Sequence, residues 1–113
     1  MVVFGAGGIG LNIIQAAALV SASPIIAVDL HDSRLELAQQ LGATHTVNSA
    51  KGDAAELIKQ ALGDQPLDVF IDNTGVPSVI EMGYQLTQRE GRVILVGVPR
   101  QGQNLNVYSL PLH

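Results

Sequence analysis

Residues 2–11 read Val-Val-Phe-Gly-Ala-Gly-Gly-Ile-Gly-Leu, a short apolar run followed by glycines in the spacing Gly5-x-Gly7-x-x-Gly10. The apolar run from Met1 to Phe4 is typical of a buried strand, and helical periodicity then extends to about Val20. Gly5 permits a tight turn, and Gly10 lets the helix pack closely on the strand. The sequence therefore predicts a strand, a glycine turn and a helix in direct succession.

The same succession of strand and helix recurs along the chain. Apolar or β-branched runs predict further strands at residues 25–28, 44–48, 67–71 and 92–96. Three more helices are predicted between them: one capped by Asp32 or Ser33, one opened by a capping box of Asp53 and Glu56, and one beginning at Pro77. Five strands alternating with four helices predict an α/β fold with a doubly wound parallel sheet in the order 3-2-1-4-5. This is the Rossmann arrangement without its sixth strand.

The composition agrees with this fold and excludes several functional classes. The 113 residues are 47% hydrophobic and only 4% aromatic, so Ala, Val, Ile and Leu must build the core, as in buried parallel strands. The net charge of −4 shows no basic patch, so nucleic acid is not an expected partner. The apolar stretch 9–20 contains Asn12 and Gln15 and follows a glycine turn, which predicts a buried helix rather than a membrane span.

No catalytic group and no metal site is predicted in this chain. It has no cysteine, which excludes disulfides, thiolate zinc sites and a cysteine nucleophile, and which fits a cytoplasmic location. The three histidines, His31, His45 and His113, share no ligand spacing. Nothing resembles a nucleophile with its base, so the sequence predicts a binding site rather than a reactive one.

The glycine turn, read together with its context, predicts a dinucleotide site. Gly7 lets the backbone approach a pyrophosphate, and Gly8 and Ile9 offer amides at the positive end of the helix dipole. Asp29 ends the second strand, where a carboxylate can bind both hydroxyls of the adenosine ribose. It would also repel a 2′-phosphate, which favours NAD(H) over NADP(H). Arg34 lies one helical turn on and could contact the ribose or the adenine edge.

Two more turns are expected to border the same crevice. The turn Asn73-Thr74-Gly75 follows the fourth strand, and the segment 96–98 ends the fifth. Because ligands bind outside the carboxyl ends of such strands, we expect Thr74, Gly75, Val96, Gly97 and Val98 to lie near the cofactor. For Gly97, the role of an ordinary turn residue is equally consistent with the sequence.

With these motifs, the sequence resembles the coenzyme domain of the zinc-dependent alcohol dehydrogenases, in the medium-chain dehydrogenase/reductase superfamily. The resemblance runs nearly end to end. Its carriers are residues 3–11 (VFGAGGIGL), 28–29, 34–35, the pattern Ala38-x-x-Leu41-Gly42-Ala43-Thr44-His45, 47–48, 68–72 with Gly75, and 91–99 (GRVILVGVP). The middle segment, 38–45, is far more specific to the family than the glycine motif.

The resemblance implies a role for each part of the site. Gly8 and Ile9 would meet the pyrophosphate, Asp29 the adenosine ribose and Arg34 the adenosine side. Residues 96–98 would lie beside the nicotinamide, with the Val96 carbonyl accepting from the carboxamide. In the intact family a catalytic zinc polarises the alcohol oxygen and hydride passes to the nicotinamide. An alcohol or carbonyl compound is therefore the implied substrate.

The family's zinc ligands belong mainly to an N-terminal catalytic domain that these residues do not contain. We therefore expect residues 1–113 to be one NAD(H)-binding domain of a larger enzyme, inactive alone, with zinc held only by the catalytic domain. The sixth strand is also truncated. The strand at 92–96 would then expose an apolar edge and promote homo-oligomers, unless residues 105–108 cover it.

Two alternative functions remain open at the level of sequence. One is a stand-alone nucleotide-sensing module, which would need only the glycine turn and Asp29. The other is the cofactor domain of a zinc-free quinone reductase using NADPH, a reading that Asp29 disfavours. The segments 41–45 and 96–99 favour the alcohol dehydrogenase over the sensor.

Overall fold

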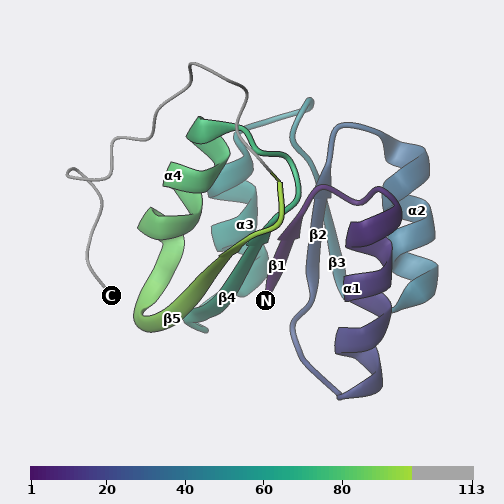
Figure 1. Ribbon diagram of the computed structural model, residues 1–113, viewed down its shortest axis with the longest axis horizontal. Coiled ribbons are helices and arrows are strands. Elements are labelled where there is room, and N and C mark those ends of the chain that lie inside the picture. The colour runs from purple at the N-terminus through teal and green to yellow at the C-terminus, as the bar shows by residue number, and fades with distance from the viewer. Residues whose placement is uncertain (98–113) are drawn as a thin grey trace.

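The computed structural model describes residues 1–97 of the chain, and strands and helices alternate throughout them (Figure 1). The strands are β1 (Val2–Phe4), β2 (Ile26–Asp29), β3 (His45–Asn48), β4 (Leu67–Asp72) and β5 (Thr87–Leu95). The helices are α1 (Gly8–Leu19), α2 (Asp32–Leu41), α3 (Ala54–Leu62) and α4 (Pro77–Leu86). The five strands form one parallel sheet in the order β3-β2-β1-β4-β5, which confirms the predicted Rossmann topology.

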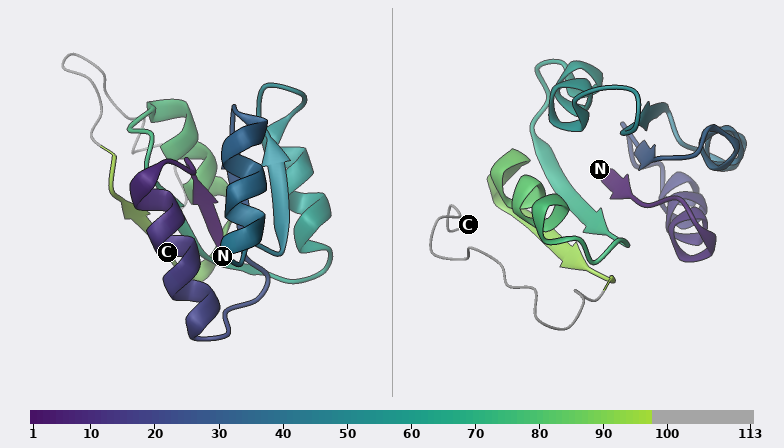
Figure 2. Two further views of the ribbon diagram at one scale, coloured as in Figure 1. Left: turned by 90° about the vertical axis from the view of Figure 1, so that its right-hand side faces the viewer. Right: turned by 90° about the horizontal axis from the view of Figure 1, so that it is seen from above.

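The helices cover both faces of the sheet, as the two views of Figure 2 show. Successive strand residues point to opposite faces, so Val2 and Phe4 pack toward α3 and α4 while Val3 packs toward α1 and α2. Apolar side chains therefore cover both faces of the sheet, and β1 and β2 are buried along their whole length. Two apolar layers hold the carboxyl ends of the strands at one edge, where the loops carry the candidate residues.

The fifth strand differs from its predicted bounds, because it begins at Thr87 rather than at residue 92. The chain passes directly from α4 into β5, and the Thr87 hydroxyl donates to the Gly83 carbonyl over 2.6 Å. The register then shifts, from Leu67 opposite Thr87 to Val69 opposite Arg92. A Cβ on Gly91 would lie 2.6 Å from the Asp68 carbonyl oxygen, so this bend needs glycine.

The helix starts confirm one predicted cap and correct another. Asp53 caps α3, and its carboxylate accepts from the amides of Ala55 and Glu56 over 3.0 and 3.3 Å. The prediction that Asp32 or Ser33 caps α2 is wrong, since His31 is the N-cap and makes no side-chain cap bond. The Asp32 carboxylate instead turns toward the loop after β3.

None of the helices among residues 1–97 is long and apolar enough to cross a bilayer. Within the same residues, no group of three or more His, Asp or Glu side chains could hold a metal ion. The candidate residue Val98, the segment 105–108 and His113 lie outside the described residues.

Candidate functional site

The glycine turn between β1 and α1 is built by two glycines that the protein's own packing requires. Gly5 has a φ of +102°, and its amide donates to the Val28 carbonyl over 2.7 Å. A Cβ on Gly10 would lie 2.0 Å from the Gly5 carbonyl oxygen, a distance that no side chain tolerates. These two residues fix the tight turn and the close approach of α1.

Gly7 and Gly8 are different, because a Cβ at either position would meet no protein atom within 4 Å. Gly7 is the N-cap of α1 and makes no side-chain cap bond, and the first turn holds no acidic residue. The first amides of a helix have no partner within the helix and need an acceptor from elsewhere. Such an end attracts an anion, which fits a pyrophosphate at Gly7, Gly8 and Ile9.

Asp29 is buried at the end of β2, and two backbone amides orient its carboxylate. Oδ2 accepts from the Ala6 amide over 2.7 Å, and Oδ1 accepts from the His31 amide over 3.0 Å. The Arg34 guanidinium lies 3.7 Å from Oδ2. A carboxylate offers about four lone-pair sites, so this one can still accept from two hydroxyl groups.

The turn after β4 is ordered by Asp72, whose side chain is completely buried. Oδ1 accepts from the amide and the hydroxyl of Thr74 over 2.9 and 2.6 Å, and Oδ2 accepts from the Gly75 amide over 2.9 Å. Gly75 has a φ of +70°, which glycine adopts without strain. Asp72 therefore has a scaffolding role that the sequence did not indicate.

Asn73 connects this turn to the glycine turn. Its Nδ2 donates to the Gly5 carbonyl over 3.1 Å, although the two residues are 68 positions apart. Its Oδ1 is buried and has no hydrogen-bond partner in the described part of the chain. An unpaired buried acceptor is uncommon in folded proteins and is often found at functional sites.

The end of β5 packs against the same turn. The amides of Val96 and Gly97 both donate to the Asp72 carbonyl, over 2.8 and 3.0 Å. A Cβ on Gly97 would lie 2.2 Å from the Gly75 amide nitrogen. Close packing of backbone on backbone therefore explains why residue 97 is glycine.

A cavity of about 650 Å³ lies among these turns, within the size range of cofactor sites. The predicted site residues that line it are Gly5, Gly7, Gly8, Ile9, Gly10, Asp29, Arg34, Thr74 and Val96. Gly75 and Gly97 are not among its lining residues, but Gly97 packs against the backbone of Asn73 and Thr74, which do line it. Lining residues that the sequence analysis did not select are Phe4, Leu30, His31, Ser49, Ala54, Asn73, Val76, Val79 and Met82.

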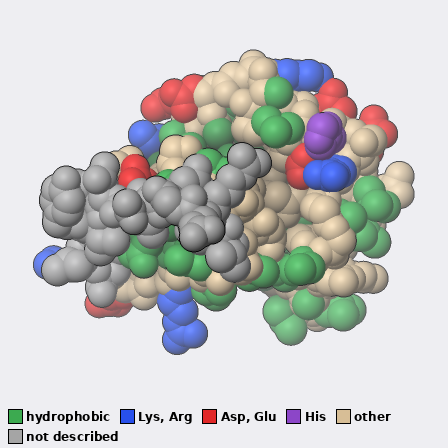
Figure 3. All heavy atoms as spheres, turned by 45° about the horizontal axis from the view of Figure 1, so that its top comes forward, with side chains coloured by type: hydrophobic (Ala, Val, Ile, Leu, Met, Phe, Trp, Pro, Cys, Tyr) green, Lys and Arg blue, Asp and Glu red, His purple; other side chains and the backbone are tan. Residues whose placement is uncertain are grey.

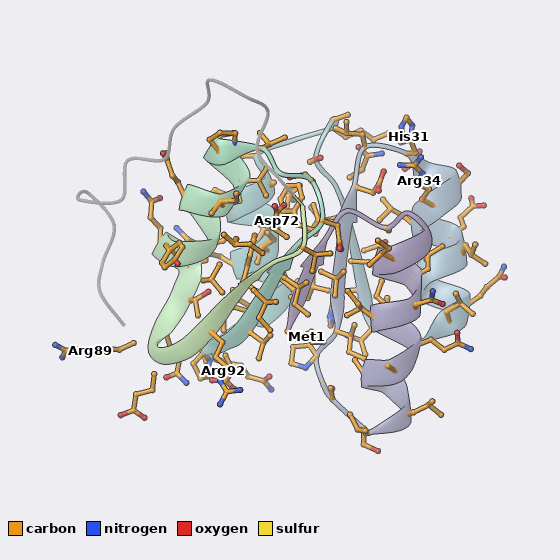
Figure 4. All side chains as sticks on the ribbon, viewed as in Figure 1. Met1, His31, Arg34, Asp72, Arg89 and Arg92 are labelled. Carbon is orange, nitrogen blue, oxygen red and sulfur yellow. The ribbon has the colours of Figure 1, made fainter. Side chains whose placement is uncertain are left out.

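The two ends of the cavity differ in charge. Figure 4 places His31 and Arg34 at the start of α2 and Asp72 at the end of β4, with β1 and its glycine turn between them. Asp29, His31 and Arg34 are the ionisable side chains among the described lining residues, and all three belong to the β2 end. The β4 end is lined by Thr74, Val76, Val79, Met82 and Val96. Figure 3 shows charged side chains of both signs around a histidine on the face that carries these loops.

Some of the missed residues have a signal in the sequence. Val76, Val79 and Met82 are spaced three apart along the start of α4, the spacing of one helix face. Ile9, Leu30, Val76 and Val96 are apolar yet exposed at the cavity rim. Exposed apolar side chains beside a cavity are suited to the flat faces of aromatic rings.

Comparison with known proteins finds one matching family and several similar dehydrogenases. Residues 8–113 match the sequence family described as zinc-binding dehydrogenase. The chain is 36% identical over 101 residues to sorbitol dehydrogenase of Bacillus subtilis, which covers 89% of this chain and 29% of that protein. It is 39% identical over 98 residues to erythritol/L-threitol dehydrogenase of Mycolicibacterium smegmatis, covering 87% of this chain and 27% of that one.

Solved structures of dehydrogenases also superpose on most of the chain. Benzyl alcohol dehydrogenase from Acinetobacter calcoaceticus superposes with a TM-score of 0.85 at 40% identity, covering 93% of this chain and 29% of that chain. A zinc-binding dehydrogenase from Sinorhizobium meliloti bound to NADP gives a TM-score of 0.84 at 32% identity, covering 93% and 31%. The chain therefore spans less than a third of the length of these four proteins.

Proposed function

The chain belongs to the zinc-binding dehydrogenase family, and we propose that residues 1–113 are the NAD(H)-binding domain of an alcohol or polyol dehydrogenase. The observation that carries this proposal is one cavity bordered by an uncapped helix N-terminus at Gly7 and a buried, oriented carboxylate at Asp29. The names of the relatives, sorbitol and erythritol/L-threitol dehydrogenase among them, support the substrate class.

The cofactor would lie across the glycine turn. Gly7, Gly8 and Ile9 would hold the pyrophosphate, and Asp29 with Arg34 the adenosine ribose. The nicotinamide half would then reach the β4 end, beside Thr74 and Val96, with Gly97 and Val98 following in the chain. When bound, the nicotinamide supplies the group that takes or gives a hydride.

This chain's own residues would bind and orient the cofactor rather than move protons. The described residues at the β4 end of the cavity carry no ionisable side chain that could act as general acid or base. We therefore propose that the zinc, the proton relay and the pocket for an alcohol or carbonyl substrate belong to a catalytic domain outside these residues.

We further propose a cytoplasmic, homo-oligomeric enzyme that binds neither nucleic acid nor membrane. The net charge of −4 supports the exclusion of nucleic acid, because a phosphate-backbone binder normally carries a basic patch.

Asp29 supports NAD(H) over NADP(H), because a 2′-phosphate on the ribose would face its negative charge. NADP(H) is the second candidate, since the Sinorhizobium meliloti relative is bound to NADP.

Titration of the purified chain with NADH and NADPH, followed by nicotinamide fluorescence, tests the choice of cofactor. NADH is expected to bind at least about tenfold more tightly, equivalent to about 1.4 kcal/mol. Asp29→Ser should narrow this difference, whereas the control Asp64→Ser, at an exposed position outside the cavity, should leave it unchanged. Tighter binding of NADPH by the unsubstituted chain would contradict the assignment to NAD(H).

A further inference from the structure

Three polar side chains join the start of α2 to the loop after β3 at the β2 end of the cavity. Asp32 is the first residue of α2, Asn48 is the last residue of β3, and Lys51 lies in the loop that follows β3. The Asp32 carboxylate accepts from Asn48 Nδ2 over 2.8 Å through Oδ1, and Lys51 Nζ lies 2.5 Å from its Oδ2. We call this group of Asp32, Asn48 and Lys51 the Asp32 clamp.

The clamp is continuous with the backbone of the loop at residues 49–53. Asn48 Oδ1 accepts from the Ala50 amide over 2.8 Å, and the Lys51 amide donates to the Asn48 carbonyl over 3.1 Å. The Ser49 amide donates to the Asp29 carbonyl over 3.0 Å. The loop is therefore tied both to Asp32 on α2 and to the residue whose carboxylate faces the cavity.

The segments that the clamp joins are two walls of the same cavity. One wall is lined by Ser49, at the start of the loop, and by Ala54, the first residue of α3 after it. Leu30, His31 and Arg34, around the start of α2, line the other. The separation of these walls sets the width of the end at which an adenosine would be bound.

The clamp contributes little to overall stability, because its charges are exposed. The side chains of Lys51 and Asp32 are 67% and 58% exposed, and ion pairs of this kind add little to the folded state. The hydrogen bonds from Lys51 and Asn48 nevertheless lower the pKa of the Asp32 carboxyl from its ordinary value. Its effect is local and lies in the position of the loop.

We propose that Asp32 and Lys51 are positioning residues for the adenosine of the bound dinucleotide. Their contact holds the loop at residues 49–53 against the start of α2, so that the adenosine meets a wall already in place. Without the contact, part of the binding free energy is spent on ordering the loop, and affinity falls. This inference rests on the proposed function.

A double-mutant cycle on the binding of ADP-ribose tests the inference. We expect Asp32→Ala and Lys51→Met each to raise the dissociation constant by about two- to fivefold, as the loss of one exposed ion pair allows. The double variant should bind no more weakly than Asp32→Ala alone, because both changes break the same contact. Lys51→Arg should retain the affinity.

Lys59 and Glu56 provide a matched control. Their side chains are 57% and 62% exposed and lie 3.4 Å apart on α3, but neither lines the cavity. Lys59→Met should leave the dissociation constant of ADP-ribose unchanged. An equal loss of affinity in this control would overturn the inference, since any exposed ion pair would then have the same effect.

Further results distinguish a failure of the positioning role of Asp32 and Lys51 from a failure of the proposed dinucleotide binding. If Lys51 contacts the ligand itself, Lys51→Met weakens binding while Asp32→Ala does not, and the inference is overturned although the proposed function stands. Additive effects of the two changes overturn it in the same way. If the unsubstituted chain is folded by circular dichroism and binds no ADP-ribose, the proposed function itself fails.

Discussion

Glycine serves two separate purposes in the turn after β1. At Gly10, a Cβ would lie 2.0 Å from the Gly5 carbonyl oxygen, so the close packing of α1 on the turn needs glycine. At Gly8, a Cβ would meet nothing within 4 Å. The lack of a side chain at Gly8 benefits only a group that approaches from outside the protein.

Alanine substitutions distinguish these purposes. Gly10→Ala should lower the free energy of unfolding by roughly 2 kcal/mol or more. The added methyl group would force the Gly5 carbonyl and α1 apart, and this movement would break other contacts. Gly8→Ala should change it by less than about 1 kcal/mol and yet weaken ADP-ribose binding. Urea denaturation and calorimetry measure the two quantities. Strong destabilisation by Gly8→Ala would contradict this account of the turn.

Asn73 combines a useful donor with an unpaired acceptor. Asn73→Leu should therefore alter the free energy of unfolding by no more than about 1 kcal/mol, because it removes both the bond to Gly5 and the unpaired Oδ1. The freed Gly5 carbonyl should loosen the glycine turn and weaken ADP-ribose binding. Thermal denaturation and calorimetry of the variant test this pair of expectations. Unchanged affinity would show that the contact does not support the site.

Sequence spacing could identify the glycines and Asp29, because the constraints on them arise within one strand-turn-helix unit and its neighbour. It placed the turn of Asn73 at the crevice but could not predict the hydrogen bond from Asn73 to Gly5, which joins residues 68 positions apart. Ser49 and Ala54 were missed for a related reason, since their place at the cavity depends on how the loop after β3 is tied to Asp32. The role of Gly97 was left open by the sequence, and packing against Gly75 explains it.

Of the two aspartates predicted to cap helices, one caps its helix and the other does not. Asp53 accepts from two amides at the start of α3. Asp32 is also an aspartate at the start of a helix, but its carboxylate binds Asn48 and Lys51 rather than the first amides of α2. The residue type at a helix start cannot show whether its side chain caps the helix, because the partners that compete for Asp32, Asn48 and Lys51, lie elsewhere in the sequence.

Removal of the α3 cap should have a measurable cost. Asp53→Ala should lower the free energy of unfolding by about 1 kcal/mol, the usual cost of losing an N-cap side chain. Ser33→Ala should cost less than about 0.5 kcal/mol, because the structure gives α2 no side-chain cap. Chemical denaturation of both variants measures the difference. Equal losses would mean that Ser33 caps α2 after all.

The start of β5 shows where sequence patterns fail for a strand. Residues 88–90 are Gln-Arg-Glu, all exposed, and a polar run of this kind gives no signal for a buried parallel strand. The strand nevertheless begins at Thr87, because its hydroxyl is bound to Gly83 and Gly91 allows the chain to bend past Asp68. These are tertiary contacts that no local pattern contains.

For the whole molecule, the alternation of strands and helices was sufficient to predict the sheet. Each of the strands β1 to β4 is followed by a helix on a face set by the right-handed crossover, so few strand orders remain. Within residues 1–97, β5 lies at the edge of this sheet, and Ile94 and Leu95 are 42% and 45% exposed.

This apolar edge is expected to pair with a second copy of the chain. Sedimentation velocity at increasing concentration should show a dimer or larger species, and Ile94→Lys should shift the population toward monomer. Val20→Lys, at an exposed position at the end of α1, should have no such effect. A monomer throughout the concentration range would contradict the prediction.

We expect the cavity to bind a dinucleotide with its pyrophosphate at the glycine turn and its adenosine ribose at Asp29. Backbone amide NMR shifts during titration with ADP-ribose test it most directly, since they report binding and location together. Saturable shifts are expected that are largest at Ala6 to Gly10 and at His31, with the amide signals of Gly63 and Gln65 unchanged. The absence of shifts in the folded chain, or shifts centred on residues 59–67, would contradict it.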